Sequence, residues 1–340
     1  MTVFTASVPS RESLSGDNDP IVIGLVNNMP DAALRTTERQ FDELLTAASS
    51  NFLVHLRLFS VPEVPRSEAG RAHIDQHYED ISQLWESRLD GLIVTGTEPH
   101  TPALADEPYW SALTKLIDWA EAQTISTVWS CLAAHAAVFH IDGIRRRPLR
   151  QKLSGVFECE KITGHPIVDA APTQWRLPHS RYNELAEVAL ASSGYQILSR
   201  SPDVGADMFV KKSKSLFVFF QGHPEYDAGA LLREYRRDVG RFLAGERDSY
   251  PEIPRGYFDE ESTAAFAAFQ QRAIHSRGMD LLSSFPVEEA KRKLRHLWRE
   301  PATRIYANWF SYLKEQRRRS YGLKKVRPTG RVHLHPNGAV

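Results

Sequence analysis

The chain has 340 residues, of which 42% are hydrophobic and 25% charged, a composition typical of a globular protein with one large core or two modest ones. Lys plus Arg and Asp plus Glu both number 42, so no overall field attracts nucleic acid, and no run is apolar enough for a membrane helix. The N-terminal segment lacks the pattern of a secretory signal, and two cysteines are too few for a disulfide framework. We therefore expect a globular, cytoplasmic protein.

The first half of the chain alternates between strand and helix patterns, after a Ser- and Asp-rich segment (1–19) that we predict to be flexible. Strands are predicted at 21–27, 52–60, 90–99 and 126–130, and helices at 31–50, 114–122 and 131–140. This alternation is typical of an α/β fold with a doubly wound, mostly parallel sheet. Sites in such sheets lie at the carboxyl ends of the strands.

The second half contains one further apolar strand, predicted at 216–220, and then becomes helical and charged from about 240 to 300. An amphipathic helix is predicted at 304–316. We therefore divide the chain into an α/β catalytic domain (20–240), a helical C-terminal region that packs on it (241–316) and a basic, disordered tail (317–340).

Cys131 lies where a predicted strand passes into a predicted helix. The positive end of the helix favours a thiolate, and the backbone amide of Leu132 can donate to an oxyanion. A lone cysteine in such a position is more often a small buried hydrophobe, so the case depends on its partners.

His223 and Glu225 supply those partners, because they follow the predicted strand 216–220 and are expected at the same sheet edge as Cys131. A Cys–His–carboxylate set accepts an acyl group and passes it to a second nucleophile. The three residues together predict a cysteine-nucleophile acyltransferase.

Several short segments strengthen this interpretation through their order along the chain. They are GLIVTG at 91–96, EPYW at 107–110, KLSGVFE at 152–158, PHSRYNEL at 178–185, GHPEYDA at 222–228 and ANWFSYL at 307–313. In this order they resemble the homoserine O-acyltransferase family of methionine biosynthesis, of the homoserine O-succinyltransferase type. The resemblance implies a fold like that of class I glutamine amidotransferases, which is flavodoxin-like, and agrees with the predicted sheet.

The resemblance also implies roles and substrates. Cys131 becomes the acyl-thioester nucleophile, His223 the general base and Glu225 its partner, in ping-pong transfer from succinyl-CoA or acetyl-CoA to L-homoserine. Lys152, Ser180 and Arg237 match substrate-binding positions of the family. Glu234 and Arg237 share a helix face, which suits the ammonium and the carboxylate of an amino acid.

Two positions depart from the family pattern. The family has an oxyanion-stabilising lysine after Met-Pro, whereas Met29-Pro30 here is followed by no lysine, and Arg35 is the candidate for the same space. The acyl-donor selector, Gly for succinyl and Glu for acetyl transfer, is matched by His100, with Glu98 two residues away. A partly cationic His100 favours succinyl-CoA, and the choice of donor stays open.

Other interpretations stay open at this point. They are a glutamine amidotransferase-like amidase with the same three residues, a non-catalytic regulator, a nucleic-acid-binding tail (317–331), and serine as the acceptor. We expect no bound cofactor and no metal, since His135 and His140 do not share a helix face. The expected partners are the small-molecule substrates, with no nucleic acid and no membrane, and a homodimer is left open.

Overall fold

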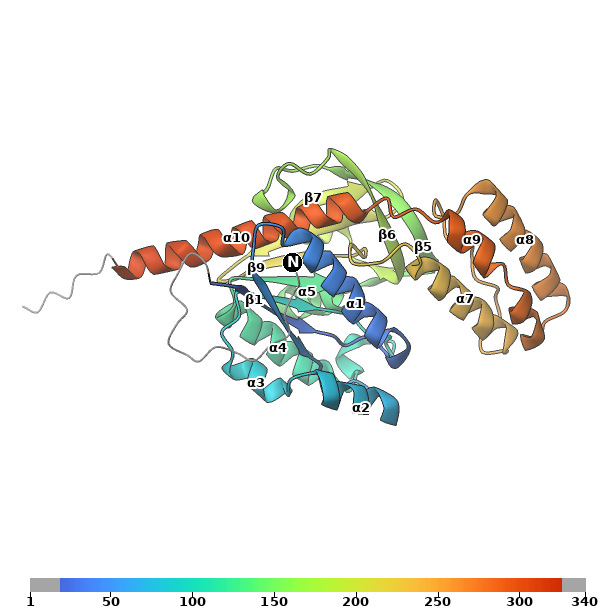
Figure 1. Ribbon diagram of the computed structural model, residues 1–340, viewed down its shortest axis with the longest axis horizontal. Helices are drawn as coiled ribbons and strands as arrows, with labels where there is room; N and C mark the ends of the chain where they lie inside the picture. Colours follow the sequence, from blue (N-terminus) through green and yellow to red (C-terminus); the bar gives the residue numbers. More distant parts are fainter. Residues whose placement is uncertain (1–18, 326–340) are drawn as a thin grey trace, which may run out of the picture.

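A nine-stranded mixed sheet runs through the computed structural model, which describes residues 19–325 (Figure 1). The strand order is β2-β1-β3-β4-β9-β8-β7-β5-β6. The first five strands in this order pair in parallel: β2 (Val54–Phe59), β1 (Ile21–Val26), β3 (Gly91–Val94), β4 (Ser126–Ser130) and β9 (Leu216–Phe220). The predicted strands therefore exist and form the parallel half of the sheet.

The other half of the sheet is antiparallel, which the sequence analysis did not anticipate. It consists of β8 (Gly205–Lys212), β7 (Gln196–Ser201), β5 (Arg147–Lys161) and β6 (Gln174–Glu184), joined to the parallel half through β9. The fold is thus α/β as expected, with a mixed rather than a mostly parallel sheet.

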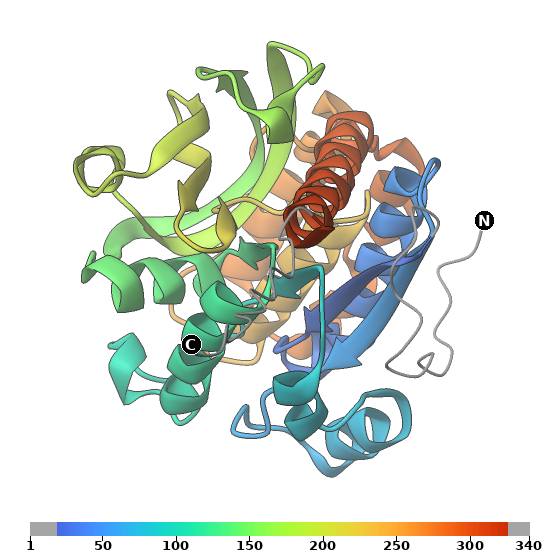
Figure 2. The ribbon, with the colours of Figure 1, turned by 90° about the vertical axis from the view of Figure 1, so that its left-hand side faces the viewer.

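Helices cover both faces of the sheet (Figure 2). On one face α1 (Asp31–Ala48) and α10 (Arg299–Lys325) pack on the sheet and share one core with it. On the other face lie α3 (Ile81–Glu86), α4 (Trp110–Gln123), α5 (Leu132–Asp142) and α6 (Glu187–Ser192). The connections add α2 (Glu68–His77) and the 3₁₀ segments η1 (Leu104–Asp106) and η2 (Pro166–Val168). Covered faces explain why every residue of the central strands β4 and β9 is buried, and why β9 is entirely apolar.

The region after 229 does not form a single unit. α7 (Ala230–Leu243), α8 (Glu260–His275), η3 (Met279–Ser284) and α9 (Val287–Lys293) enclose a separate aromatic core at one end of the molecule (Figure 1), which we call the helical module (230–293). α10 instead returns to the main sheet, where Trp309 Nε1 donates to Ser126 Oγ at 2.9 Å.

α10 also corrects the expected start of the tail, because the helix continues to Lys325. Arg317 on this helix pairs with Asp90 at 3.0 Å, so residues after 316 are part of the fold. The predicted flexible segment up to residue 18 and the tail beyond 325 lie outside the described residues. Across residues 19–325, no helix combines the length and the apolar character needed to cross a bilayer.

Candidate active site

Cys131 occupies the sharp turn between β4 and α5. It is the N-cap of α5, with φ 51° and ψ −112°, a backbone conformation that L-residues adopt only at a cost of about 1–3 kcal/mol. Its N–H donates to the carbonyl of Phe220 at 2.8 Å, which fixes the turn to the end of the neighbouring strand β9. The half-buried thiol is thereby held at the carboxyl edge of the sheet.

His223 and Glu225 lie beside this turn, as predicted from the positions of the two strands. Glu225 Oε1 lies 2.9 Å from His223 Nδ1, and both side chains are buried. Burial by itself would lower the pKa of His223, but the charge of Glu225 and the contact with Cys131 outweigh burial and raise this pKa well above its ordinary value. Ser130 Oγ also donates to Glu225 Oε1 at 3.4 Å, and the second oxygen of Glu225 has no hydrogen-bond partner among the described residues.

Tyr226 connects this group to a second set of polar residues. Its ring stacks on His223 with centroids 4.1 Å apart and planes at 14°, which restricts the imidazole to one orientation. Its hydroxyl donates to Glu234 Oε1 at 2.5 Å.

Glu234 is the hub of that second set. Lys152 Nζ donates to Glu234 Oε2 at 3.1 Å and to Asp238 at 2.7 Å, and Ser180 Oγ also donates to Glu234. Desolvation raises the pKa of Glu234, but the charges of Lys152 and Arg237 and the two hydroxyl donors outweigh it and lower this pKa to about 2. The carboxylate is therefore ionised and largely occupied by protein donors.

Arg237 lies one turn along α7 from Glu234 and lines the same cavity. Its Nε and one terminal nitrogen donate to Asp238 at 2.9 and 2.8 Å, and 40% of its side chain is exposed. The other terminal nitrogen is free of these contacts, so the guanidinium can still meet an anion.

The cavity that contains Cys131 has a volume of about 210 Å³. Its charged lining, besides the histidines, consists of Arg146, Lys152, Arg181, Arg237 and Arg241 with Glu98, Glu225 and Glu234. Five cations against three carboxylates favour an anionic ligand, although the whole chain has no net charge.

The expected oxyanion donor Leu132 is the first residue of α5, so its amide has no acceptor within the helix. Gly96, at the end of β3, lies directly against it: a Cβ on Gly96 would be 3.0 Å from the Leu132 nitrogen and 2.9 Å from its Cβ. Only a glycine lets the chain pass this closely. The structure does not bring Arg35 to this place, because its side chain is exposed on α1 and does not line the cavity.

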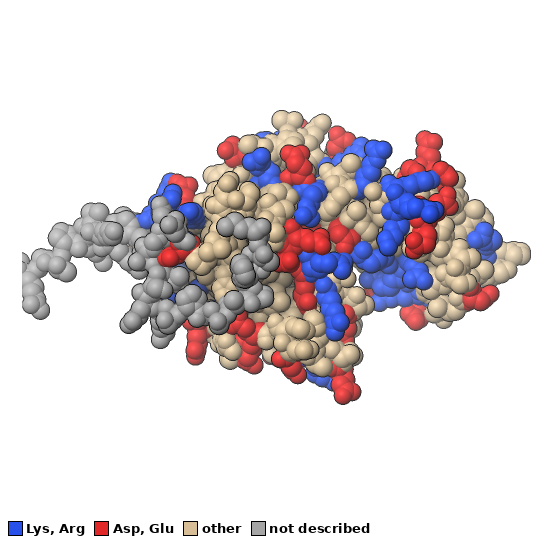
Figure 3. All heavy atoms as spheres, in the orientation of Figure 1, with Lys and Arg blue, Asp and Glu red and all other residues tan. Residues whose placement is uncertain are grey.

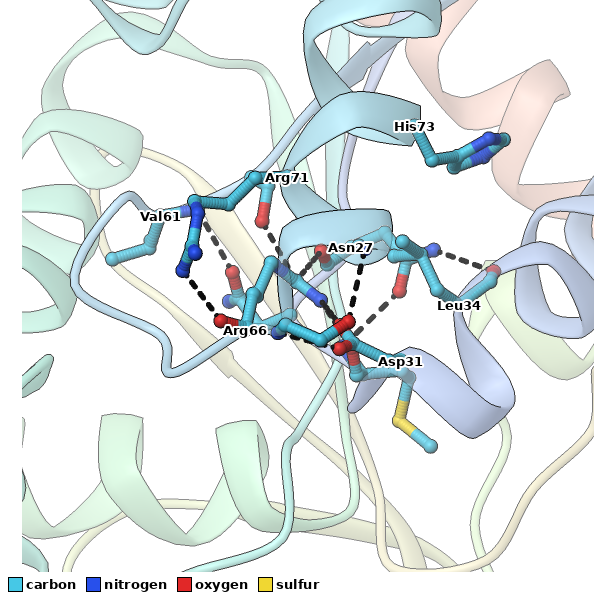
Figure 4. A network of polar contacts seen from close by, with 12 residues as sticks. Asn27, Asp31, Leu34, Val61, Arg66, Arg71 and His73 are labelled. Carbon is cyan, nitrogen blue, oxygen red and sulfur yellow. Dashed lines mark hydrogen bonds and ion pairs between the residues drawn. The ribbon is translucent and has the colours of Figure 1, made fainter.

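The Met29-Pro30 segment does line the cavity, and a buried arginine holds it in place (Figure 4). Arg66 donates to the carbonyls of Met29 at 2.9 Å and Asn27 at 3.2 Å, and pairs with Asp31 at 3.4 Å. Arg66 therefore holds the Met29-Pro30 segment, which departs from the family pattern, in a fixed position.

The two donor-selector candidates both line an outer hollow, but only Glu98 also lines the cavity of Cys131. Glu98 lines the cavity but pairs with Arg241 through two contacts of 2.8 and 3.1 Å, so its charge is balanced. His100 is exposed and lines the outer hollow, and its backbone N–H is held by Glu107 at 2.7 Å.

Arg146 and Arg181 are the functional candidates that sequence reasoning missed. Both line the cavity, and both are close enough to Cys131 for the charge of a thiolate to raise their pKa, against a larger lowering by burial. Arg181 is buried and donates to two backbone carbonyls, whereas Arg146 has only a 3.4 Å contact with the Pro102 carbonyl. In the sequence Arg146 belongs to an Arg-Arg-Arg run (145–147), a pattern that is typical of solvent-exposed residues and does not indicate a site.

A second Cys–His–carboxylate group was also missed. Cys159, His179 and Asp207 are fully buried, with potential metal-ligating atoms within 4.8 Å of one another. Burial lowers the pKa of His179 and raises that of Cys159, and in both cases it favours the uncharged form. The group is closed to substrates, which leaves Cys131 as the accessible thiol.

Taken as a whole, a strained cysteine beside a buried His–Glu pair at adjacent strand ends is the arrangement with which cysteine-nucleophile enzymes transfer acyl groups. The model of the homoserine O-succinyltransferase family matches residues 5–320. Homoserine O-succinyltransferase of Rhodopseudomonas palustris is 49% identical over 296 residues, covering 87% of this chain and 89% of its own. That of Bradyrhizobium japonicum is 45% identical over 313 residues, covering 90% and 96%. The chain belongs to the homoserine O-succinyltransferase family.

Solved structures are more distant. A glutamine amido transferase from Methylobacillus flagellatus is 15% identical with a TM-score of 0.46, covering 93% of this chain and 99% of that one. A Thermotoga maritima glutamine amidotransferase is 12% identical with a TM-score of 0.44, covering 86% and 97%.

Proposed function

We propose that the chain transfers an acyl group from acyl-CoA to the hydroxyl of L-homoserine through a thioester on Cys131, a step of methionine biosynthesis. The observation that supports this most strongly is the strained Cys131 beside the buried His223–Glu225 pair, in a chain of this family. Both substrates are small metabolites, and we expect the reaction to take place in the cytoplasm.

The first half of the reaction forms the acyl-enzyme. Cys131 Sγ attacks the thioester carbonyl while the Leu132 N–H stabilises the oxyanion, and CoA leaves as a thiol after taking a proton from His223. In the second half, His223 Nε2 accepts the proton of the homoserine hydroxyl, whose oxygen attacks the acyl carbon and releases Cys131. Glu225 stabilises the imidazolium in both halves.

Homoserine is expected to bind between α7 and the catalytic group. The free side of Arg237 suits its carboxylate. Glu234 has one lone pair left beside its three protein donors, which suits the ammonium, while Lys152 and Ser180 hold that carboxylate in position.

The donor is expected to be succinyl-CoA. A succinyl group carries a free carboxylate that an acetyl group lacks, and Arg146 is a cavity cation without an acidic ion-pair partner among the described residues. Glu98 does not oppose it, since Arg241 balances its charge. Arg146 thus takes over the role that the sequence analysis gave to His100.

Intact-protein mass spectrometry tests the proposal. After incubation with succinyl-CoA or acetyl-CoA, we expect a succinyl adduct that disappears when homoserine is added, with O-succinylhomoserine as the product. Cys131→Ala should form no adduct, whereas Cys159→Ala, which removes the other thiol, should still form one.

An enzyme that forms no adduct and acylates neither homoserine nor serine would contradict the proposal. Hydrolysis of glutamine under the same conditions would then support the amidase.

A further inference from the structure

α7 carries a row of exposed arginines, of which Arg237 also lines the catalytic cavity. Arg233, Arg236 and Arg237 recur at intervals of three and four residues, so they project from one side of the helix. The opposite side contributes Tyr235 and Val239 to the core of the helical module. The row is therefore an exposed surface of the module and is not part of its packing.

These arginines form the rim of a hollow between α7, η3 and α9, with a volume of about 440 Å³. Leu232, Leu282 and Val287 form its apolar floor, and Lys291 of α9 completes the rim. No Asp or Glu is among the described residues that line it. Figure 3 shows the blue Lys and Arg atoms gathered over α7 and α9. An apolar floor with a cationic rim fits a flat ring that bears phosphates.

Two of the rim cations have no acidic partner. Arg233 and Arg237 pair with neighbouring aspartates at 2.8 Å, whereas Arg236 and Lys291 form no ion pair with any residue in the described range 19–325. Both are exposed, so their charges cost little to keep in water and are available to a ligand.

The hollow adjoins the catalytic cavity, because Arg237 lines both. Arg233 and Arg237 line both it and an intermediate hollow, and the intermediate hollow shares Met29, Glu234 and Arg241 with the cavity of Cys131. An elongated ligand can therefore lie along α7 with one end at Cys131 and the other at Lys291.

We propose that this hollow binds the nucleotide end of the acyl-CoA donor, with its adenine on the apolar floor and its phosphates on Arg236 and Lys291. The proposal rests on the proposed function, which requires a thioester donor of this length. It also assigns a function to the helical module: α7 and α9 would bind the nucleotide of the donor at a site that the α/β domain lacks.

Equilibrium binding of CoA itself tests the proposal without any acyl transfer. Isothermal titration of the full chain should give an affinity for CoA that exceeds the affinity for pantetheine, and that falls with added salt. In Arg236→Glu/Lys291→Glu this preference should fall by at least about tenfold, because two attractive contacts with phosphate become repulsive. Arg88→Glu/Lys214→Glu is the matched control, since these exposed cations precede β3 and β9 at the opposite ends of the strands.

The outcomes are separable. An unchanged preference for CoA over pantetheine in Arg236→Glu/Lys291→Glu would overturn the proposal. A wild-type chain that binds CoA in the expected manner but acylates no amino acid would retain the nucleotide site and overturn the proposed function alone.

Discussion

Cys131 combines a reactive position with an unfavourable backbone. A positive φ aims the thiol at His223 from the start of α5, and the rest of the fold has to balance the strain of about 1–3 kcal/mol. Two inactive variants can separate that strain from the chemistry.

We expect Cys131→Gly to be more stable than Cys131→Ala by about 1 kcal/mol. Glycine relieves the strain at this turn. Its greater conformational entropy stabilises the unfolded chain by about 0.5–1 kcal/mol, which offsets only part of that stabilisation. Urea unfolding of the two variants measures the difference. Ala136→Gly, in the interior of α5, should instead destabilise by about 1 kcal/mol. Equal stability of the two Cys131 variants would show that the turn is not strained.

Arg146 is the residue on which the choice of donor depends. Arg146→Met should lower kcat/KM for succinyl-CoA by about 10- to 100-fold and that for acetyl-CoA much less, because only the succinyl group offers a carboxylate. Arg145→Met, which removes the neighbouring exposed cation outside the cavity, is the control. Equal losses with the two donors would assign Arg146 a purely structural role.

At the scale of elements, the site depends on three loops that meet at the ends of β3, β4 and β9. The contact of Gly96 with Leu132 is the narrowest point between them, and it places the end of β3 against the first amide of α5. A small change there should alter catalysis more than folding.

Gly96→Ala should reduce kcat by about 10- to 100-fold, because the new methyl group pushes the loop away from the oxyanion donor. We expect a loss of stability of only about 1–2 kcal/mol. Gly164→Ala, where a Cβ would meet nothing within 4 Å, should leave both unchanged. Steady-state kinetics and thermal unfolding of the two variants provide the comparison; a Gly96→Ala enzyme with wild-type kcat would rule out this role for the loop.

The predictable part of the fold was the part that rests on local patterns. The strand 216–220 is a continuous apolar run and the short strand 126–130 directly precedes a helix pattern, so both strands and the approach of Cys131 to His223 could be predicted from the sequence. β5 to β8 were not predicted, because exposed polar residues interrupt their apolar runs. For the same reason Arg146 and Arg181, which reach the cavity from this antiparallel half, went unnoticed.

At the scale of the whole molecule, Glu234 joins parts that are distant in sequence. The residue belongs to α7 of the helical module, and its carboxylate binds Lys152 on β5, Ser180 on β6 and Tyr226 in the loop after β9. The attachment of the module to the sheet is therefore tied to the ionisation of one buried group. A homodimer stays a prediction.

This attachment makes the stability of the fold depend on pH in a defined window. The pKa of Glu234 falls from its ordinary value of 4.5 to about 2 in the fold, so the folded state favours the ionised form. Its contribution is fully present above pH 4.5 and is lost as the pH falls toward 2, a change of about 3 kcal/mol. Glutamine cannot ionise, so the stability of Glu234→Gln lacks this contribution at every pH.

We expect the difference in unfolding free energy between wild type and Glu234→Gln to be largest at pH 6 and to shrink by about 3 kcal/mol as the pH approaches 2. Urea unfolding at pH 6 and pH 2.5 measures it, with Glu252→Gln as the control for the loss of an exposed carboxylate. Two curves that stay parallel over this range would show that Glu234 is not held ionised by Lys152 and Arg237, and that the module is attached by its apolar contacts alone.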